Sequence, residues 1–277
     1  MFRPFVKKLI ENIPDELKRD KKKLKLDLIL TGCYTFNVSF LTGALLFLKE
    51  MEERNYVKVC RISGNGLGAV AGLLYFCDSV NTLQDYNLET LPNLGFILKN
   101  KIPPKILKNK LFLSYYDASA CLKINKSKFK SNDKLIDDVI KSCYLPLLVD
   151  GDVVYKNKYM DGLTPYLFDV KRDRQILYCC PFNYGNLRVS MNTCQETTCT
   201  SKVLCGLLDI HGFFITQQSS SMCSYFNDWS CCDKKIDFLK YVIERITVYI
   251  VYVVLIVKPW VPDYVSKRTT NLFSRLS

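Results

Sequence analysis

The sequence predicts an α/β fold in which helices flank a mostly parallel central sheet. The first observation is an alternation of strand and helix patterns over residues 26–77, which produces parallel strands joined by crossover helices. The second is composition: 48% of the 277 residues are hydrophobic and 13% are aromatic, enough for a sizeable core. The third is a further buried-strand pattern, ILYCCPF, at residues 176–182.

Residues 1–25 are expected to form a basic, amphipathic appendage. A helix that begins near Pro4 and ends before Pro14 places its apolar side chains on one face. These side chains are Phe5, Val6, Leu9, Ile10 and Ile13. Two roles fit such a face: it packs on the domain, or it lies on a membrane surface.

The main domain is predicted over residues 26–183. Strand patterns occur at 26–32, 56–63, 110–116, 121–129 and 176–182, with a strand or hairpin at 153–162. Helical patterns occur at 39–53, 67–77 and 134–143, the last with Ser131 as its N-cap. Residues 80–109 are expected to be helical and irregular, because prolines interrupt them.

Residues 184–277 are expected to form a cysteine-rich and apolar extension. Segment 234–257 is strongly apolar, but its uncharged run, 246–257, has only 12 residues. A membrane-spanning helix needs about 20 residues, so this run is too short for a full crossing. The segment either contacts a membrane surface or packs as a core helix or strand. Its candidate interfacial anchors are Lys258, Trp260, Tyr264, Lys267 and Arg268.

The 13 cysteines are expected to be free thiols. Their number is odd, which argues against a closed set of disulfides. The N-terminus lacks the apolar core of a signal peptide, which predicts an intracellular chain, cytoplasmic or peripheral to a membrane, where thiols stay reduced. Cys194, Cys199, Cys223 and the pair at 231–232 lack the C-x2-C spacing of zinc sites. Neither a metal nor a cofactor is therefore predicted.

The formal net charge of +12 is compatible with an anionic partner. Basic residues cluster at 18–25, 99–110 and 123–134, and they form either a solvated surface or a surface that attracts anionic lipid. Nucleic acid is not favoured, because the sequence lacks zinc-finger spacing, an RNA-binding aromatic signature and a helix-turn-helix pattern. No sequence feature identifies a protein partner.

A glycine-rich turn, Gly64-Asn65-Gly66-Leu67-Gly68, connects the strand at 56–63 to the next helix. This setting is typical of a nucleophile elbow, G-x-S-x-G, in which a serine is held on a tight turn. Here glycine occupies the central position.

The same turn also satisfies a dinucleotide-binding pattern, through Gly64, Gly66 and Ala69. Asp85 follows at about the distance at which such folds place an acid that binds ribose. This alternative is less favoured, because another strand precedes the loop and residues 79–90 do not resemble a strand end.

Three further motifs accompany the elbow. They are Thr31-Gly32-Cys33 after the first strand, Ser142-Cys143-Tyr144-Leu145-Pro146 at a helix end, and Tyr159-Met160-Asp161-Gly162. In this order they resemble the patatin-like phospholipase family, most closely its adipose triglyceride lipase-like branch. The resemblance covers residues 26–183 and implies a three-layer α/β fold that hydrolyses lipid esters with a Ser–Asp dyad.

The resemblance implies a role for each motif residue. Gly66 takes the position of the nucleophile, whose serine is lost, and Asp161 takes that of the dyad base, followed by Gly162. The elbow residues around Gly66 are Gly64, Asn65, Leu67 and Gly68. Small residues at 64 and 68 suit the tight turn.

The oxyanion turn implied by the resemblance consists of the main-chain amides of Gly32, Cys33 and Tyr34. This turn departs from the family pattern, because residues 33–36 are bulky where glycines are usual. The segment after the Asp-Gly pair, 163–165, is also shorter than in the family.

The missing serine predicts a catalytically inactive, lipid- or membrane-associated pseudoenzyme. Glycine adopts the strained backbone of an elbow without a side-chain clash, so the substitution removes strain and chemistry together. The alternative is an active phospholipase or triacylglycerol lipase with another nucleophile, Cys33 or Ser63. His211, the one histidine, has apolar neighbours in sequence and is expected in the core rather than as a base.

Overall fold

The computed structural model of the chain describes residues 2–19, 23–32, 38–85, 107–181 and 198–260. Within these ranges a seven-stranded mixed sheet has the order β4-β3-β2-β1-β6-β7, and β5 pairs with β3. The strands are β1 (Leu24–Leu30), β2 (Val57–Gly64), β3 (Leu111–Asp117), β4 (Leu122–Lys126), β5 (Tyr159–Asp161), β6 (Gln175–Cys179) and β7 (Cys223–Tyr225). The predicted α/β class is confirmed.

Parallel pairing dominates the centre of the sheet. Strand β1 pairs in parallel with β2 and β6, and β2 pairs in parallel with β3. The antiparallel pairs β3–β4, β3–β5 and β6–β7 lie toward the edges. Strand β1 is central because both of its faces are apolar: Leu28, Ile29 and Leu30 are all fully buried.

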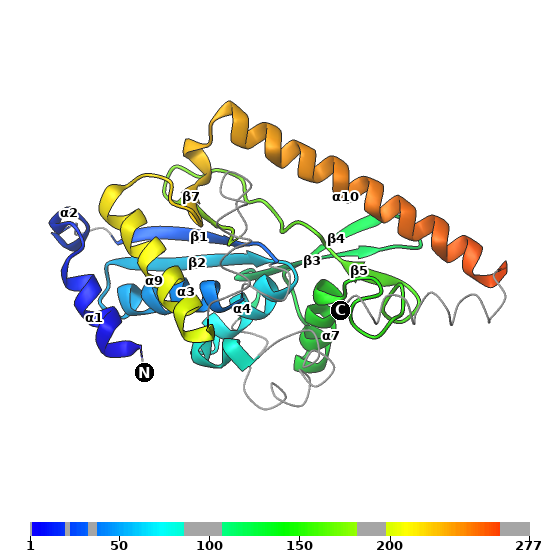
Figure 1. Cartoon of the computed structure of the whole chain (residues 1–277), viewed down its shortest axis with the longest axis horizontal. Coiled ribbons are helices and arrows are strands. Elements are labelled where there is room, and N and C mark those ends of the chain that lie inside the picture. Colours follow the sequence, from blue (N-terminus) through cyan, green and yellow to red (C-terminus); the bar gives the residue numbers. More distant parts are fainter. Residues whose placement is uncertain (1, 20–22, 33–37, 86–106, 182–197, 261–277) are drawn as a thin grey trace.

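Helices cover both faces of this sheet (Figure 1). The helices are α1 (Arg3–Glu11), α2 (Asp15–Arg19), α3 (Val38–Glu53), α4 (Leu67–Phe76), α7 (Asn132–Cys143), α9 (Cys199–Thr216) and α10 (Cys231–Val257). Short 3-10 helices are η1 (Val80–Asp85), η4 (Phe226–Asp228) and η5 (Lys258–Trp260). Helix α10 lies over one face, and α3 and α4 lie over the other.

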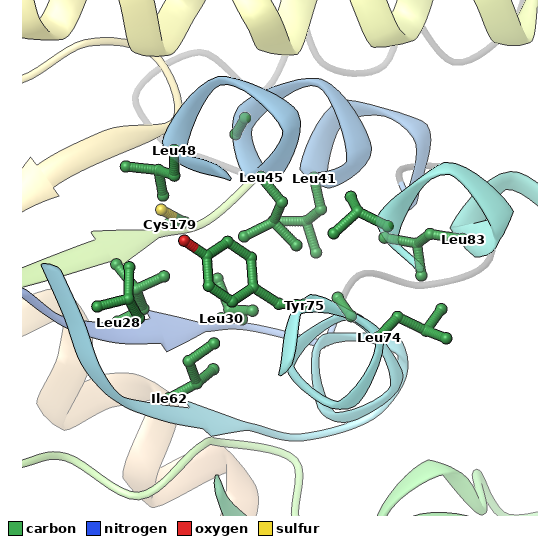
Figure 2. Packing of buried hydrophobic residues seen from close by; sticks show 14 of the residues in the cluster. Leu28, Leu30, Leu41, Leu45, Leu48, Ile62, Leu74, Tyr75, Leu83 and Cys179 are labelled. Carbon is green, nitrogen blue, oxygen red and sulfur yellow. The ribbon is translucent and has the colours of Figure 1, made fainter. Parts of the chain in front are cut away.

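The main core lies between α3, α4 and the sheet. Figure 2 shows Leu41 and Leu45 of α3 and Tyr75 of α4 packed above Leu28 and Leu30 of β1. All five side chains are fully buried. This apolar layer fixes α4, and therefore the turn that precedes it, against the carboxyl ends of β1 and β2.

Helix α9 was not anticipated from the sequence. It packs on α3 through two glycines: a Cβ on Gly43 would lie 2.0 Å from the carbonyl oxygen of Val203, and one on Gly206 would lie 2.0 Å from that of Phe40. The two backbones are therefore in direct contact. Helix α9 and strand β7 also share the main core cluster through Phe213 and Cys223, so part of the C-terminal segment completes this core.

Helix α1 begins with proline in its first turn, as predicted, and buries Val6 and Ile10 in the main core cluster beside α3. Of the two roles considered for its apolar face, packing on the domain is the one observed. Ser131 caps α7 by accepting a hydrogen bond from the amide of Lys134, also as predicted.

The apolar segment 234–257 belongs to the single continuous helix α10. Ser230 and Asp233 form a reciprocal capping box at its start, which explains why the helix begins there. Among the residues that the structure describes, one helix is long and apolar enough to cross a membrane by length and composition. That helix is α9, a third of which is buried inside the protein. Residues Tyr264, Lys267 and Arg268 lie outside the described ranges.

Candidate functional site

The glycine turn forms a tight connection between β2 and α4. Strand β2 ends at Gly64 and α4 begins at Leu67, with Gly66 as its N-cap at φ 53° and ψ −138°. Residues with a side chain rarely adopt a positive φ of this kind. The turn is held by hydrogen bonds from the Gly66 amide to the Ser142 carbonyl, 2.8 Å, and from the Gly68 amide to the Asn65 carbonyl, 2.9 Å.

The two outer glycines allow backbone to pack on backbone. A Cβ on Gly64 would lie 2.5 Å from the carbonyl oxygen of Gly68, and a Cβ on Gly68 would lie 2.3 Å from that of Leu30. Both distances are shorter than any real contact of a Cβ atom. The turn therefore presses against the end of β1 and requires glycine at both positions.

Asp161 lies directly beside the central glycine. A Cβ on Gly66 would be 3.2 Å from Oδ2 of Asp161 and 3.1 Å from Cα of Gly32. Strand β5 carries Asp161 to this place by pairing with β3, and the Asp161 amide donates to the Tyr144 carbonyl at 2.8 Å. Positions 32, 66 and 161, which lie far apart in the sequence, therefore meet at one point. Gly162 follows in close contact with Ser114.

Asn65 connects the other parts of this site. Its Oδ1 accepts a hydrogen bond from the Gly32 amide at 2.8 Å, and its Nδ2 donates to Oδ1 of Asp161 at 3.1 Å. The side chain is buried. Sequence reasoning treated Asn65 only as a spacer, although a buried asparagine needs such partners. The main-chain N–H of Gly32 already donates to Asn65. Gly32 therefore does not present a free N–H group to a ligand.

Burial raises the pKa of Asp161 to about 7. Hydrogen bonds from Asn65 and from the Leu163 amide oppose this shift, as does the positive charge of Lys123, whereas Glu244 adds to it. A carboxyl group with such a pKa exists in both protonation states at neutral pH. That is a property of a general base, although no side chain at position 66 supplies a proton to it.

The end of α7 joins the glycine turn to Asp161. The carbonyl of Ser142 accepts from the Gly66 amide, the Cys143 thiol donates to the Gly66 carbonyl at 2.9 Å, and the Tyr144 carbonyl accepts from the Asp161 amide. The Ser142 hydroxyl donates to the Ser114 carbonyl at 2.8 Å. The sequence marked this segment as a motif without indicating that it forms the connection.

Cys143 is a thiol beside the turn that sequence reasoning did not weigh as a nucleophile. It is buried, and burial together with the charge of Asp161 raises its pKa well above the ordinary value. Since the thiolate is the reactive form, Cys143 is not activated as a nucleophile. Its role is to donate a hydrogen bond to the turn.

The other candidate nucleophiles and bases do not join this site. Ser63 is fully buried within β2, and its hydroxyl has no hydrogen-bond partner among the described residues. His211 lies on α9, where its ring meets Phe47 edge-on at 5.9 Å between centroids, and burial lowers its pKa. Cys33 and Tyr34 lie outside the described ranges.

The structure gives little support to a dinucleotide or metal site. The amides of Gly66 and Gly68 are already bonded to carbonyls, so they are not available to a pyrophosphate. Asp85 closes η1 rather than a strand. Within the described ranges no group of three or more histidine, cysteine or acidic residues could hold a metal ion. The cysteines there are all free, and Cys194 is not among them.

Two small cavities lie beneath α10, and the larger of the two is lined by Thr164 and Pro165, which follow Asp161. They measure about 200 and 130 Å³, below the usual size of a pocket for a drug-sized ligand. Tyr178 and Asp237 line both of them. Neither cavity is lined by Gly66 or Asp161, so neither is the acyl-chain cleft that the resemblance implies.

Neither family models, nor curated proteins, nor solved structures gave a match.

Proposed function

We propose that the chain is a patatin-like acyl hydrolase scaffold without its nucleophile, acting as a lipid- or membrane-associated pseudoenzyme. One observation carries the proposal: position 66 has a positive φ in a tight strand-to-helix turn and faces Asp161, yet it carries no side chain. A tight turn of this kind between a strand and a helix is the setting of a catalytic serine in α/β hydrolases.

The chemistry of a dyad explains what is missing. In such a dyad the carboxylate takes a proton from the serine hydroxyl, which then attacks an ester carbonyl. A hydroxyl attached at position 66 would come within hydrogen-bond reach of Asp161, because the Cβ itself lies 3.2 Å from Oδ2. The raised pKa of Asp161 suits proton transfer near neutral pH. Glycine at position 66 removes the attacking atom and keeps the base.

Lipid association is supported by charge and by the distribution of apolar surface. The net charge is +12, which favours anionic surfaces. Large apolar side chains are also exposed on α10, whose buried Glu244 hydrogen-bonds Thr164, three residues beyond Asp161. A scaffold that no longer turns over lipid can still bind it through such surfaces.

The test is ester hydrolysis by the wild type beside Gly66→Ser, on a phospholipid, a triglyceride and a water-soluble short-chain ester. We expect an inactive wild type and measurable turnover by Gly66→Ser. Gly66→Ala is the matched control, since it adds the same backbone strain without a hydroxyl. Turnover by the wild type would overturn the proposal and favour a working lipase with another nucleophile. Turnover by Gly66→Ala equal to that of Gly66→Ser would show that position 66 is not the nucleophile position.

A further inference from the structure

Exposed apolar side chains concentrate on α10. Twelve of its large hydrophobic residues are more than a third exposed. They are Ile236, Phe238, Leu239, Tyr241, Ile243, Ile246, Tyr249, Ile250, Val253, Val254, Ile256 and Val257. Trp260, in η5 directly after the helix, is 84% exposed. Soluble monomers rarely expose a contiguous apolar surface of this kind without a partner.

The apolar residues in the second half of α10 form one stripe. Positions 246, 249, 250, 253, 254 and 257 follow a spacing of three and four residues, which places them on a single helical face. The buried residues of the helix, Glu244, Val248 and Val251, lie on the opposite face. The exposed stripe is therefore not the face with which α10 packs on its own domain.

Hydrogen bonds hold the buried face of α10 against the rest of the domain. Glu244 accepts hydrogen bonds from Lys123 at 2.7 Å and from the hydroxyls of Tyr116 and Thr164. Val248 and Val251 pack in one cluster with Tyr116 and Met160, the neighbour of Asp161. Because these contacts hold the helix in one orientation, the exposed stripe faces outward as a fixed surface. Figure 1 shows α10 along the outside of the molecule, on the sheet face away from α3 and α4.

Charge and aromatic side chains indicate what this surface binds. No charged residue occurs in 246–257, whereas exposed lysines lie near both ends of the helix, Lys234 and Lys235 at its start and Lys258 directly after its end. Lysine at the ends of an apolar segment and tryptophan at its boundary are typical of segments that lie at the surface of an anionic bilayer. The segment 246–257 is about 18 Å long as a helix, shorter than the roughly 30 Å of bilayer hydrocarbon, so it does not span.

A second copy of the chain fits this surface less well. Paired helices cover a narrow seam and usually carry charged residues beside it. Here the apolar surface is wider than a seam, since Phe238 and Ile256 lie to one side of the stripe and are 67% and 51% exposed. Lipid covers a wide apolar face, whereas one partner helix leaves its sides exposed.

We propose that α10 lies in the plane of an anionic lipid bilayer, with the stripe from Ile246 to Val257 in the acyl region and Trp260 at the interface. This inference deepens the proposed function and rests on it, because it names the surface by which the scaffold meets lipid. The contact between Glu244 and Thr164 then holds Asp161 and the glycine turn at a fixed distance from the bilayer.

The experiment is co-sedimentation of the full chain with vesicles of phosphatidylcholine, with and without phosphatidylserine. We expect retention by the anionic vesicles at low salt. Ile246→Glu with Ile250→Glu should lower the partition coefficient at least tenfold. In the wild type both isoleucine side chains move from water into lipid on binding, and the variant loses this apolar burial. Val170→Glu with Leu208→Glu is the matched control, since these residues are similarly exposed, 58% and 49%, and neither belongs to α10. The control variant should bind like the wild type.

A second readout locates the contact. The chain has two tryptophans, so Trp229→Phe leaves Trp260 as the only reporter. Its emission should shift to the blue with anionic vesicles and be quenched by brominated lipid. Unchanged Trp260 emission, or equal binding by the Ile246→Glu/Ile250→Glu variant, would overturn the inference. So would a stable dimer in sedimentation velocity that this variant dissociates, since a second copy would then cover the stripe. The soluble ester requires no bilayer, so its turnover by Gly66→Ser does not depend on whether α10 binds lipid, and the two proposals fail separately.

Discussion

Oδ2 of Asp161 lies 3.2 Å from the point that a Cβ at position 66 would occupy. This relationship joins the end of β5 to the turn between β2 and α4, two segments almost a hundred residues apart in sequence. The same turn has a backbone that favours glycine, with φ of 53° at Gly66. A side chain at this position would therefore be strained and would point at a buried carboxyl group.

The first prediction concerns the cost of a side chain at position 66. Gly66→Ser and Gly66→Ala should each lower the free energy of unfolding by about 1–3 kcal/mol, because a residue with a Cβ is strained at this φ and ψ. The new Cβ would also lie 3.1 Å from Cα of Gly32. Urea denaturation measures the loss. A variant as stable as the wild type would show that the turn is not constrained as described.

The second prediction concerns Asn65. Asn65→Ala removes hydrogen bonds to the Gly32 amide and to Asp161 in a buried setting, so it should cost about 1–3 kcal/mol of unfolding free energy. Asn227→Ala is the control, since Asn227 is exposed and its bond to Gln175 is long, 3.4 Å; its cost should stay within about 0.5 kcal/mol. Equal losses in the two variants would contradict a bridging role for Asn65.

The third prediction is a pH dependence caused by Asp161. Its pKa in the folded chain, about 7, lies above the ordinary value of 3.8, so the folded state binds the proton more tightly. The stabilising contribution of Asp161 is fully present below pH 3.8 and is lost as the pH rises to about 7. The limiting slope is about 1.4 kcal/mol per pH unit.

Asp161→Asn should remove this slope, so the variant gains stability relative to the wild type as the pH rises through this window. Urea denaturation of both proteins at several pH values measures the difference. Asp173→Asn serves as the control, because Asp173 is exposed and its pKa is lowered by Lys25. If the free energies of unfolding of the wild type and of Asp161→Asn changed in parallel with pH, the pKa of Asp161 would not be raised by folding.

In Gly66→Ser the rate of ester hydrolysis should rise with pH through about 7, as the base ionises.

The parts of the fold that were predictable from sequence are those with strong local patterns. Strands β1 and β2 and helices α3 and α4 lie within a few residues of their predicted bounds, because continuous apolar runs and glycine turns mark them. Helix α9 was missed since it follows a cysteine-rich stretch without a clear pattern. What determines its position is the direct backbone contact at Gly43 and Gly206, which no local pattern reveals.

The candidate site shows a similar division. The glycines at 64 and 68 and the strain at 66 were predictable, because elbow geometry depends on local sequence. The bridge made by Asn65 was not, since both of its partners come from other segments. The raised pKa of Asp161 depends on burial by the whole fold and could not be read from an Asp-Gly pair.

The fourth prediction separates two glycines on α9. Gly206→Ala should destabilise the chain by about 1–3 kcal/mol or more, because its Cβ would lie 2.0 Å from a backbone oxygen of α3 and the helices would have to move apart. Gly212→Ala is the control on the same helix, with nothing within 4 Å of its Cβ. It should be neutral or stabilising by up to about 1 kcal/mol, since alanine favours a helix. Thermal or urea unfolding of both variants measures the contrast, and similar values would contradict close packing of α9 on α3.

The last prediction concerns Glu244, the buried carboxylate that fixes α10. Glu244→Ala leaves Lys123, Tyr116 and Thr164 without their shared partner, so the free energy of unfolding should fall by about 3 kcal/mol. Glu53→Ala, which breaks an exposed pair with Arg3, should cost about 1 kcal/mol or less. Hydrogen exchange distinguishes a local from a global effect. In Glu244→Ala, amides of α10 should lose protection before those of β1 and β2, because the helix is otherwise held by few buried side chains. Unchanged protection of α10 would mean that Val248 and Val251 suffice to hold it, and that Glu244 is not what fixes its apolar face outward.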